Sequence, residues 1–309
     1  MCHGPGRSTI GMNTGKGVLI LNYRLRKKLA PLIFIGPFLV IFLFFMVYPI
    51  VYSVILSFAR YRSGDIVFIG LKNYTYILTD PLFYQSLENT FIIFLIQVPI
   101  MTVLALIVGN LLNSTLLKAK GLFRMFIFMP VLIDTVSYSI VFSLIFRENG
   151  GFANNMLGIL GIQPLHWLSV GYLAKAVIIV AVTWRWTGYN SVIMLSGLQN
   201  VPGELYEAAS IDGASAVVKF IKITIPELKP VIVFSIINSI NGTLQLFTEP
   251  NLLTGNGGPV NKTLTMVLYL YNTGFKSFNF GVASAGSYVL AIIIVVLALV
   301  QLRLTREKS

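Results

Sequence analysis

Six long apolar stretches are the feature that most constrains how this chain of 309 residues can fold. They cover residues 31–57, 91–113, 123–146, 172–196, 230–253 and 282–302. About 20 apolar residues in a helix cross the ~30 Å hydrocarbon core of a bilayer. Only 11% of the residues are charged, against about 25% in a soluble domain. The sequence therefore predicts an all-α polytopic protein with six transmembrane helices in a lipid bilayer, plus an interfacial or re-entrant segment near 263–275.

The distribution of Lys and Arg predicts how these helices are oriented. Most of the 23 basic residues lie before the first stretch, between the second and third, between the fourth and fifth, and after the sixth. Basic residues concentrate in short cytoplasmic loops, so both termini are expected to be cytoplasmic. The predicted parts are a partly disordered cytoplasmic segment 1–30, a transmembrane domain 31–302 and a cytoplasmic tail 303–309. The net charge of +12 follows from this topology and gives no reason to expect nucleic acid.

Metal, disulfide and catalytic chemistry are not indicated by the sequence. Cys2 is the single cysteine, and His3 and His166 are far apart in the chain, so we expect no disulfide and no metal site. Gly11–Gly17 (GMNTGKG) has the wrong spacing for a phosphate loop, and Gly17 stands where Ser or Thr is needed. We therefore expect no enzyme activity and no cofactor in this chain. The stretch 31–57 is too long for a signal-peptide core, so we expect it to remain as a membrane helix.

A polar stretch, Tyr206–Pro230, interrupts the apolar pattern on the predicted cytoplasmic side. Pro202 suits the first position of a short helix, and Gly213 suits the cap at its end. Ser215 can cap a second helix, which Pro226 would end. From this pattern alone, the stretch is either an ordinary solvated loop or a surface that another protein approaches closely.

The same stretch resembles the EAA loop of ABC importer permeases. The matching residues form its Glu-Ala-Ala, Asp-Gly-Ala and trailing proline elements: Glu207, Ala208, Ala209, Asp212, Gly213, Ala214 and Pro226. The resemblance implies the type I ABC importer permease fold. It also implies that a coupling loop at about 197–230 docks on a partner ATPase subunit, which binds ATP and Mg²⁺ and hydrolyses the ATP.

Further segments resemble the carbohydrate permeases of the maltose type. They are FIGLKNY (Phe68–Tyr74), DPLFYQSLENT (Asp80–Thr90), WRWTGYN (Trp184–Asn190), LTGNGGPVNKT (Leu253–Thr263) and FGVASAG (Phe280–Gly286). Relatives usually read Thr-Gly-Gly-Gly-Pro where Asn256 interrupts the glycines here, and Asn tolerates left-handed backbone. The resemblance implies import of an oligosaccharide across a bacterial inner membrane. It also implies an extracytoplasmic solute-binding protein, a second related permease in a heterodimer, and two ATPase subunits.

Other functions stay open at this point. A glycerol-3-phosphate-type permease is the close alternative, although the absence of Arg and Lys between Phe234 and Pro250 favours a neutral substrate. An ion-coupled secondary transporter would need internal repeats and carboxylates at mid-membrane, and the sequence has no evident repeat. A membrane-embedded enzyme has no catalytic motif to support it.

The fifth apolar stretch carries a row of neutral polar side chains. They are Asn238, Ser239, Asn241, Thr243 and Gln245. Helical spacing puts Asn238, Asn241 and Gln245 on one face, where amides could bind sugar hydroxyls. The aromatic side chains Trp184, Trp186 and Tyr189 of the fourth stretch could supply flat faces for sugar rings. The alternative is that these side chains hydrogen-bond between helices and only hold the bundle together.

Two charged residues are expected inside the apolar stretches. Asp134 lies in the third and Arg185 in the fourth. Charges at this depth usually face the interior of a bundle and find partners. They could pair with each other, or each could reach water or a partner subunit.

Overall fold

The computed structural model describes residues 33–62, 65–114 and 117–306. The chain divides into two compact units, 1–56 and 57–309. The described part of the first unit belongs to one helix, Ile33–Ser57, which contains the π-helical turn η1 (Leu43–Val47) and α2 (Tyr48–Ser57). Most of its side chains are exposed and apolar, as lipid contact requires. The predictions for residues 1–30 and 307–309 lie outside the described residues.

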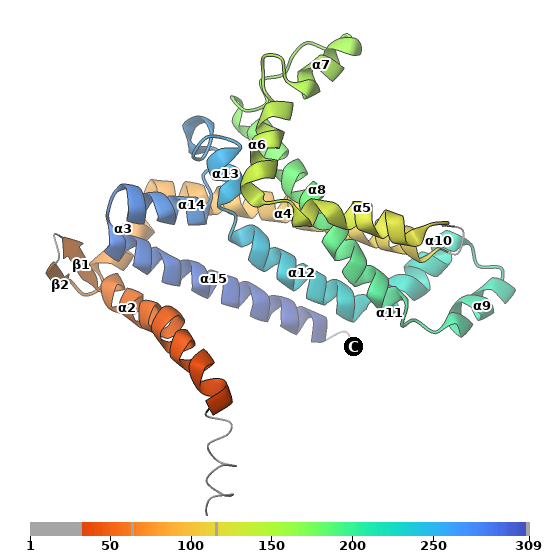
Figure 1. The fold of residues 1–309 in the computed structure, drawn as a ribbon, viewed down its shortest axis with the longest axis horizontal. Coiled ribbons are helices and arrows are strands. Elements are labelled where there is room, and N and C mark those ends of the chain that lie inside the picture. Colours follow the sequence, from red (N-terminus) through yellow and green to blue (C-terminus); the bar gives the residue numbers. More distant parts are fainter. Residues whose placement is uncertain (1–32, 63–64, 115–116, 307–309) are drawn as a thin grey trace, which may run out of the picture. The chain divides into compact units, whose positions relative to one another are not determined.

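The second unit is almost entirely helical (Figure 1). It opens with an antiparallel hairpin of β1 (Ala59–Arg62) and β2 (Asp65–Phe68), in which Ala59 pairs with Phe68. Its helices follow in this order: α3 (Lys72–Thr79), α4 (Pro81–Asn113), α5 (Lys120–Leu132), α6 (Thr135–Ile145), α7 (Phe152–Ile159), α8 (Gly171–Leu198), α9 (Gly203–Ile211), α10 (Ala216–Lys219), η2 (Phe220–Thr224), α11 (Ile225–Glu227), α12 (Lys229–Leu244), α13 (Thr248–Leu252), η3 (Pro259–Asn261), α14 (Met266–Tyr271), η4 (Asn272–Lys276) and α15 (Phe280–Arg306).

Four of the described helices are long and apolar enough to cross a membrane. They are Ile33–Ser57, Pro81–Asn113, Lys229–Leu252 and Phe280–Arg303. α5 and α6 together form a fifth candidate, but they are bent by 94°. α8 has 28 residues and is not among these candidates. The six-helix count is compatible with this arrangement and stays a prediction.

The third predicted stretch, 123–146, is not one straight helix. It breaks after Leu132, where Ile133 and Asp134 adopt extended or irregular backbone. The Asp134 carboxylate accepts hydrogen bonds from the backbone N–H of Val136 at 2.9 Å and of Ser137 at 3.3 Å. A side chain that caps the first turn in this way stabilises the N-terminus of a new helix. The fifth stretch breaks similarly, between Leu244 and Thr248.

The long helices of the second unit pack through close backbone approaches. α4 and α8 form its most extensive pair. A Cβ on Gly188 would lie 1.7 Å from the backbone oxygen of Ile127, so α8 and α5 touch backbone to backbone. Small residues allow such contacts in membrane bundles. One apolar core lies between α4, α6 and α8, and another between α3, α14 and α15.

The first part of the short apolar segment 263–275 belongs to the second core. Met266 and Leu268 at the start of α14 are fully buried, and α14 contacts both α4 and α15. The preceding loop has left-handed backbone at Asn256, with φ of 56°, as expected for an Asn in that position. Whether the segment is interfacial or re-entrant stays a prediction.

Candidate functional site

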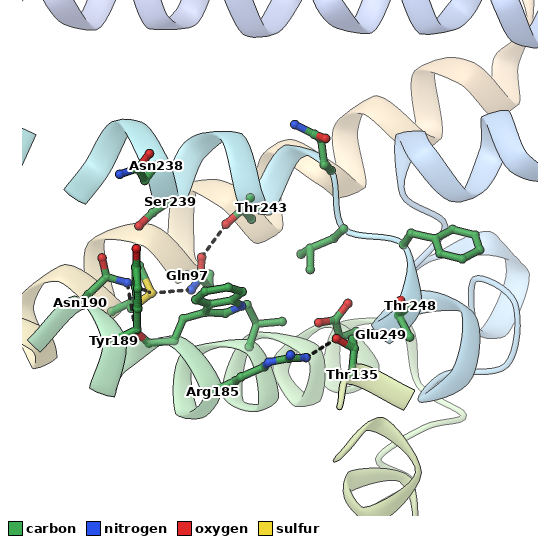
Figure 2. A pocket seen from close by; sticks show the side chains of 17 residues that line it. Gln97, Thr135, Arg185, Tyr189, Asn190, Asn238, Ser239, Thr243, Thr248 and Glu249 are labelled. Carbon is green, nitrogen blue, oxygen red and sulfur yellow. Dashed lines mark hydrogen bonds between the residues drawn. The ribbon is translucent and has the colours of Figure 1, made fainter. Parts of the chain in front are cut away.

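A cavity of about 240 Å³ lies among α4, α8 and α12, bordered by the start of α6 and the segment after α12 (Figure 2). Most of its polar lining consists of neutral amides and hydroxyls, and aromatic rings line it as well. The lining residues are Gln97, Met101, Thr135, Val182, Arg185, Trp186, Tyr189, Asn190, Asn238, Ser239, Gly242, Thr243, Gln245, Leu246, Phe247, Thr248 and Glu249.

Several of these polar groups hold the helices together. The Thr243 hydroxyl donates to Gln97 Oε1 at 2.8 Å, which ties α12 to α4. The Ser235 hydroxyl donates to Asn190 Oδ1 at 2.5 Å, which ties α12 to α8. All four side chains are buried, so the alternative of polar contacts between helices describes these residues well.

Other polar groups of the lining are less buried. Asn238 is exposed and Ser239 half-buried, and both line the cavity beside Thr243. Gln245 lines it too, and donates to Asn241 Oδ1. Asn241 itself is not among the lining residues. At about 100° per residue in an α-helix, it is rotated about 60° from Asn238, which takes it off the wall.

Two of the three expected aromatic side chains line the cavity, and the third does not. Tyr189 lines the cavity as expected, together with Trp186, and the two rings are edge to face with centroids 5.8 Å apart. Trp184 points elsewhere and packs on Phe142, 5.4 Å between ring centroids. Trp184 therefore contributes to the packing of α8 against α6 and does not line the cavity. Residues two apart on a helix face different directions.

One end of the cavity is charged (Figure 2). Arg185 of α8 donates from Nη1 to the Thr135 hydroxyl, and its guanidinium carbon lies 4.7 Å from the centroid of the Tyr138 ring. The Tyr138 hydroxyl donates to Glu249 Oε1. Glu249 is only 4% exposed. The Thr135 hydroxyl oxygen and the Tyr138 ring thus stabilise the guanidinium, and the Tyr138 hydroxyl stabilises the carboxylate, without a direct bond between the two charges.

The two expected intramembrane charges do not meet. Asp134 caps α6 and Arg185 binds Thr135, and no ion pair joins them within 4.0 Å in the described structure. Glu249, Gln97 and Asn190 also line the cavity and were not predicted from the sequence. A usable signal existed for Glu249, an acidic residue inside the apolar stretch 230–253.

The stretch expected to couple to an ATPase forms a separate feature, here called the coupling segment (Gly203–Glu227). α9 begins after Pro202, which is its N-cap. Gly213 follows α9 with φ of 73°, and the Ser215 hydroxyl accepts from Val218 N–H at 3.4 Å to cap α10. The predicted pair of helices with a glycine turn is confirmed.

The second helix of the coupling segment runs past the expected end at Pro226. α10 continues through the π-helical turn η2 into α11, which contains Pro226. A proline ring clashes with the carbonyl four residues earlier in a regular helix, and a π-turn changes that spacing. The second helix ends at Glu227, and the buried Leu228 is its C-cap.

The coupling segment is anchored on one side and open on the other. The hydroxyls of Tyr206 and Thr224 are 2.9 Å apart and join its two helices. Five of the seven matching residues are exposed, and Ala209 and Ala214 are half-buried; the exposed ones are Glu207, Ala208, Asp212, Gly213 and Pro226. Ile211 is 87% and Val217 65% exposed, so large apolar side chains stand on this surface.

Residues 83–306 match the family described as "Binding-protein-dependent transport system inner membrane component". The chain is 44% identical over 281 residues to the lactose transport system permease protein LacF of Rhizobium radiobacter, covering 90% of this chain and 94% of that one. It is 41% identical over 284 residues to the arabinooligosaccharides transport system permease protein AraP of Bacillus subtilis, covering 90% and 89%.

Solved structures agree on the fold. A bacterial ABC transporter involved in the import of the acidic polysaccharide alginate matches 92% of this chain and 99% of its own chain, with a TM-score of 0.76 and 20% identity. The alginate transporter in complex with a pentasaccharide-bound periplasmic protein matches with a TM-score of 0.78 and 19% identity, covering 92% and 98%. The chain therefore belongs to the binding-protein-dependent inner membrane components, as a multi-pass transport subunit with the fold of an ABC importer permease.

Proposed function

We propose that this chain is the permease subunit of an importer that takes up an oligosaccharide delivered by an extracytoplasmic binding protein. The observation that carries this is the cavity, whose lining places neutral polar groups such as Asn238, Ser239 and Gln245 beside the rings of Trp186 and Tyr189. Sugar hydroxyls both donate and accept hydrogen bonds, as amides and hydroxyls do, and aromatic faces match the apolar faces of sugar rings. The relatives named for lactose and for arabinooligosaccharides support the same substrate class.

The coupling segment is proposed to transmit force from ATP hydrolysis. Its exposed apolar side chains Ile211 and Val217 suit an apolar docking cleft on an ATPase. We infer two ATPase subunits, which bind ATP and Mg²⁺, and a second related permease that completes a heterodimer. The proposed location is the inner membrane of a bacterium, with the coupling segment and both termini in the cytoplasm.

A glycerol-3-phosphate-type permease is the second candidate. Arg185 lines the cavity, and a guanidinium is a good partner for a phosphate. Glu249 lines the same end and would repel a phosphate, which favours the neutral glycan. An ion-coupled secondary transporter is disfavoured by the family match over residues 83–306.

The test is substrate-stimulated ATP hydrolysis by the complex reconstituted in lipid. The complex is supplied in turn with lactose, arabinotriose and glycerol 3-phosphate, each with the cognate binding protein. We expect a neutral glycan to stimulate hydrolysis several-fold over the rate with binding protein alone. Stimulation by glycerol 3-phosphate and by neither glycan would establish the second candidate instead.

A further inference from the structure

The charged end of the cavity is built in an unusual way. Arg185 from α8 and Glu249 from α13 line the same cavity, yet no ion pair joins them within 4.0 Å in the described part of the chain. Each is held by a neutral hydroxyl, Thr135 for the guanidinium and Tyr138 for the carboxylate. Figure 2 shows Arg185, Thr135 and Glu249 together at one end, away from Asn190 and Asn238.

In this arrangement, the two charged side chains do not use all of their hydrogen-bonding capacity. A guanidinium has five N–H donors and a carboxylate can accept about four hydrogen bonds. Arg185 Nε is buried and has no hydrogen-bond partner among the described residues. Buried charges are costly unless they are paired and fully hydrogen-bonded. Two separated charges with spare hydrogen-bonding capacity on one cavity wall therefore suit a ligand that supplies further hydrogen-bond partners.

We propose that Arg185 and Glu249 form a subsite that binds neighbouring hydroxyls of one sugar ring. Glu249 accepts a hydrogen bond from one hydroxyl, and Arg185 donates to the oxygen of the next. The subsite rests on the proposed import of an oligosaccharide and adds a selectivity to it. Its two charges cancel, so a neutral ring satisfies both, whereas a ring with a carboxylate brings a like charge against Glu249 in a region of weak screening.

The geometry also gives the two residues distinct roles in selectivity. Glu249 is held by Tyr138 from α6, and α13 contacts α6, so the carboxylate has a fixed position. Glu249 is thus the residue that rejects an anionic ring. Arg185 is a general donor, since its N–H groups can bind the oxygens of either kind of ring.

The experiment uses the assembled complex without its binding protein. The probes are radiolabelled digalacturonate and whichever of lactose and arabinotriose stimulates ATP hydrolysis more. Equilibrium dialysis gives a Kd for each. Glu249→Gln keeps the shape and can still accept from the Tyr138 hydroxyl. We expect it to weaken binding of the neutral probe about tenfold, by loss of a charge-assisted hydrogen bond, and to strengthen binding of digalacturonate. We expect Arg185→Gln to weaken both.

A matched control separates binding from a purely structural role. Tyr138→Phe removes the hydroxyl that holds Glu249 but keeps both charges, so the preference for the neutral probe should persist. If Glu249→Gln and Tyr138→Phe lower the amount of assembled complex alike, and both Kd values per complex stay at wild-type levels, the subsite is wrong. If neither neutral glycan stimulates the wild-type complex, the proposed function fails first, and the subsite with it.

Discussion

Individual amides and hydroxyls of the cavity have different tasks, although they look alike in the sequence. The hydroxyl of Thr243 is committed to Gln97, and the amide of Asn190 to Ser235. Asn238 is exposed on the wall, while Asn241 faces away and accepts from Gln245. A substitution should therefore affect either assembly or transport, according to which task the side chain has.

Asn238→Leu should slow uptake per assembled complex about fivefold. It removes one hydrogen bond to the glycan, worth ~1 kcal/mol, without touching a contact between helices. Asn241→Leu is the matched control, an amide of the same helix that is off the wall, and should leave uptake per complex near wild type. Radiolabelled glycan uptake, normalised to complex quantified from the same vesicles, makes the comparison. The reverse order of effects would put Asn241 on the path and Asn238 off it.

Thr243→Val should act on stability instead. It leaves the buried Oε1 of Gln97 without its donor, which costs roughly 1–3 kcal/mol. We expect less assembled complex and a lower thermal midpoint in detergent, with uptake per surviving complex unchanged. A normal thermal midpoint combined with a loss of uptake per complex would show that this hydroxyl binds substrate.

Among the connecting elements, the loop around α7 depends on one buried side chain. Asn154 donates to the carbonyls of Glu148 and Leu165 and accepts from Leu165 N–H and from Trp167 Nε1, at 2.8–3.0 Å. The nearby Glu148 carboxylate accepts from Ser169 N–H at 3.1 Å, and this bond, together with the one to His166, lowers the pKa of Glu148. The loop is thus fastened by polar contacts.

Asn154→Ala should loosen this loop without affecting the rest of the molecule. Four polar groups lose their partner, which costs several kcal/mol locally at ~1 kcal/mol or more per bond. Hydrogen exchange measured by mass spectrometry should rise across 148–169. Asn155→Ala, at the exposed neighbouring position, should leave exchange unchanged. Equal protection in both variants would mean that apolar packing, and not Asn154, fixes the loop.

The turn of the coupling segment offers a test that separates backbone strain from bulk. Gly213 has φ of 73°, and a Cβ there would meet nothing within 4 Å. Gly213→Asn tolerates this backbone and adds little volume, so it should retain near wild-type uptake. Gly213→Trp adds bulk where the ATPase is proposed to seat, and should lower glycan-stimulated ATP hydrolysis more than tenfold with normal membrane insertion. Wild-type hydrolysis in Gly213→Trp would rule out docking at this turn.

The composition of the whole complex follows from the single coupling segment of this chain. ABC transporters have two ATPase sites, so the second site needs a coupling segment from elsewhere. We expect native mass spectrometry of the purified complex to give one copy of this chain, one related permease and two ATPase subunits. A complex with two copies of this chain and no second permease would contradict the heterodimer.

Much of this architecture could be predicted, because long apolar stretches and the coupling motif are local patterns. The helices α4 and α15 and the capped turn at Ser215 agree with the prediction for that reason. The helix break at Asp134 could not be predicted, since an acidic residue in an apolar stretch indicates a buried ion pair as readily as a helix N-cap. The cavity wall depends on how α4, α8 and α12 rotate against each other, so Gln97 and Asn190 were missed and Asn241 was misplaced.

The polar character of α12 also has a consequence for how the protein is made. Lys229–Leu252 is the least apolar of the four described spanning candidates, and its Ser235 and Thr243 are bonded to side chains of α8 and α4. Alone in lipid, these groups and Glu249 would have no partners. We expect the insertion machinery to retain this segment until α4 and α8 are beside it, so that the three helices enter the bilayer as a group and not one by one during synthesis.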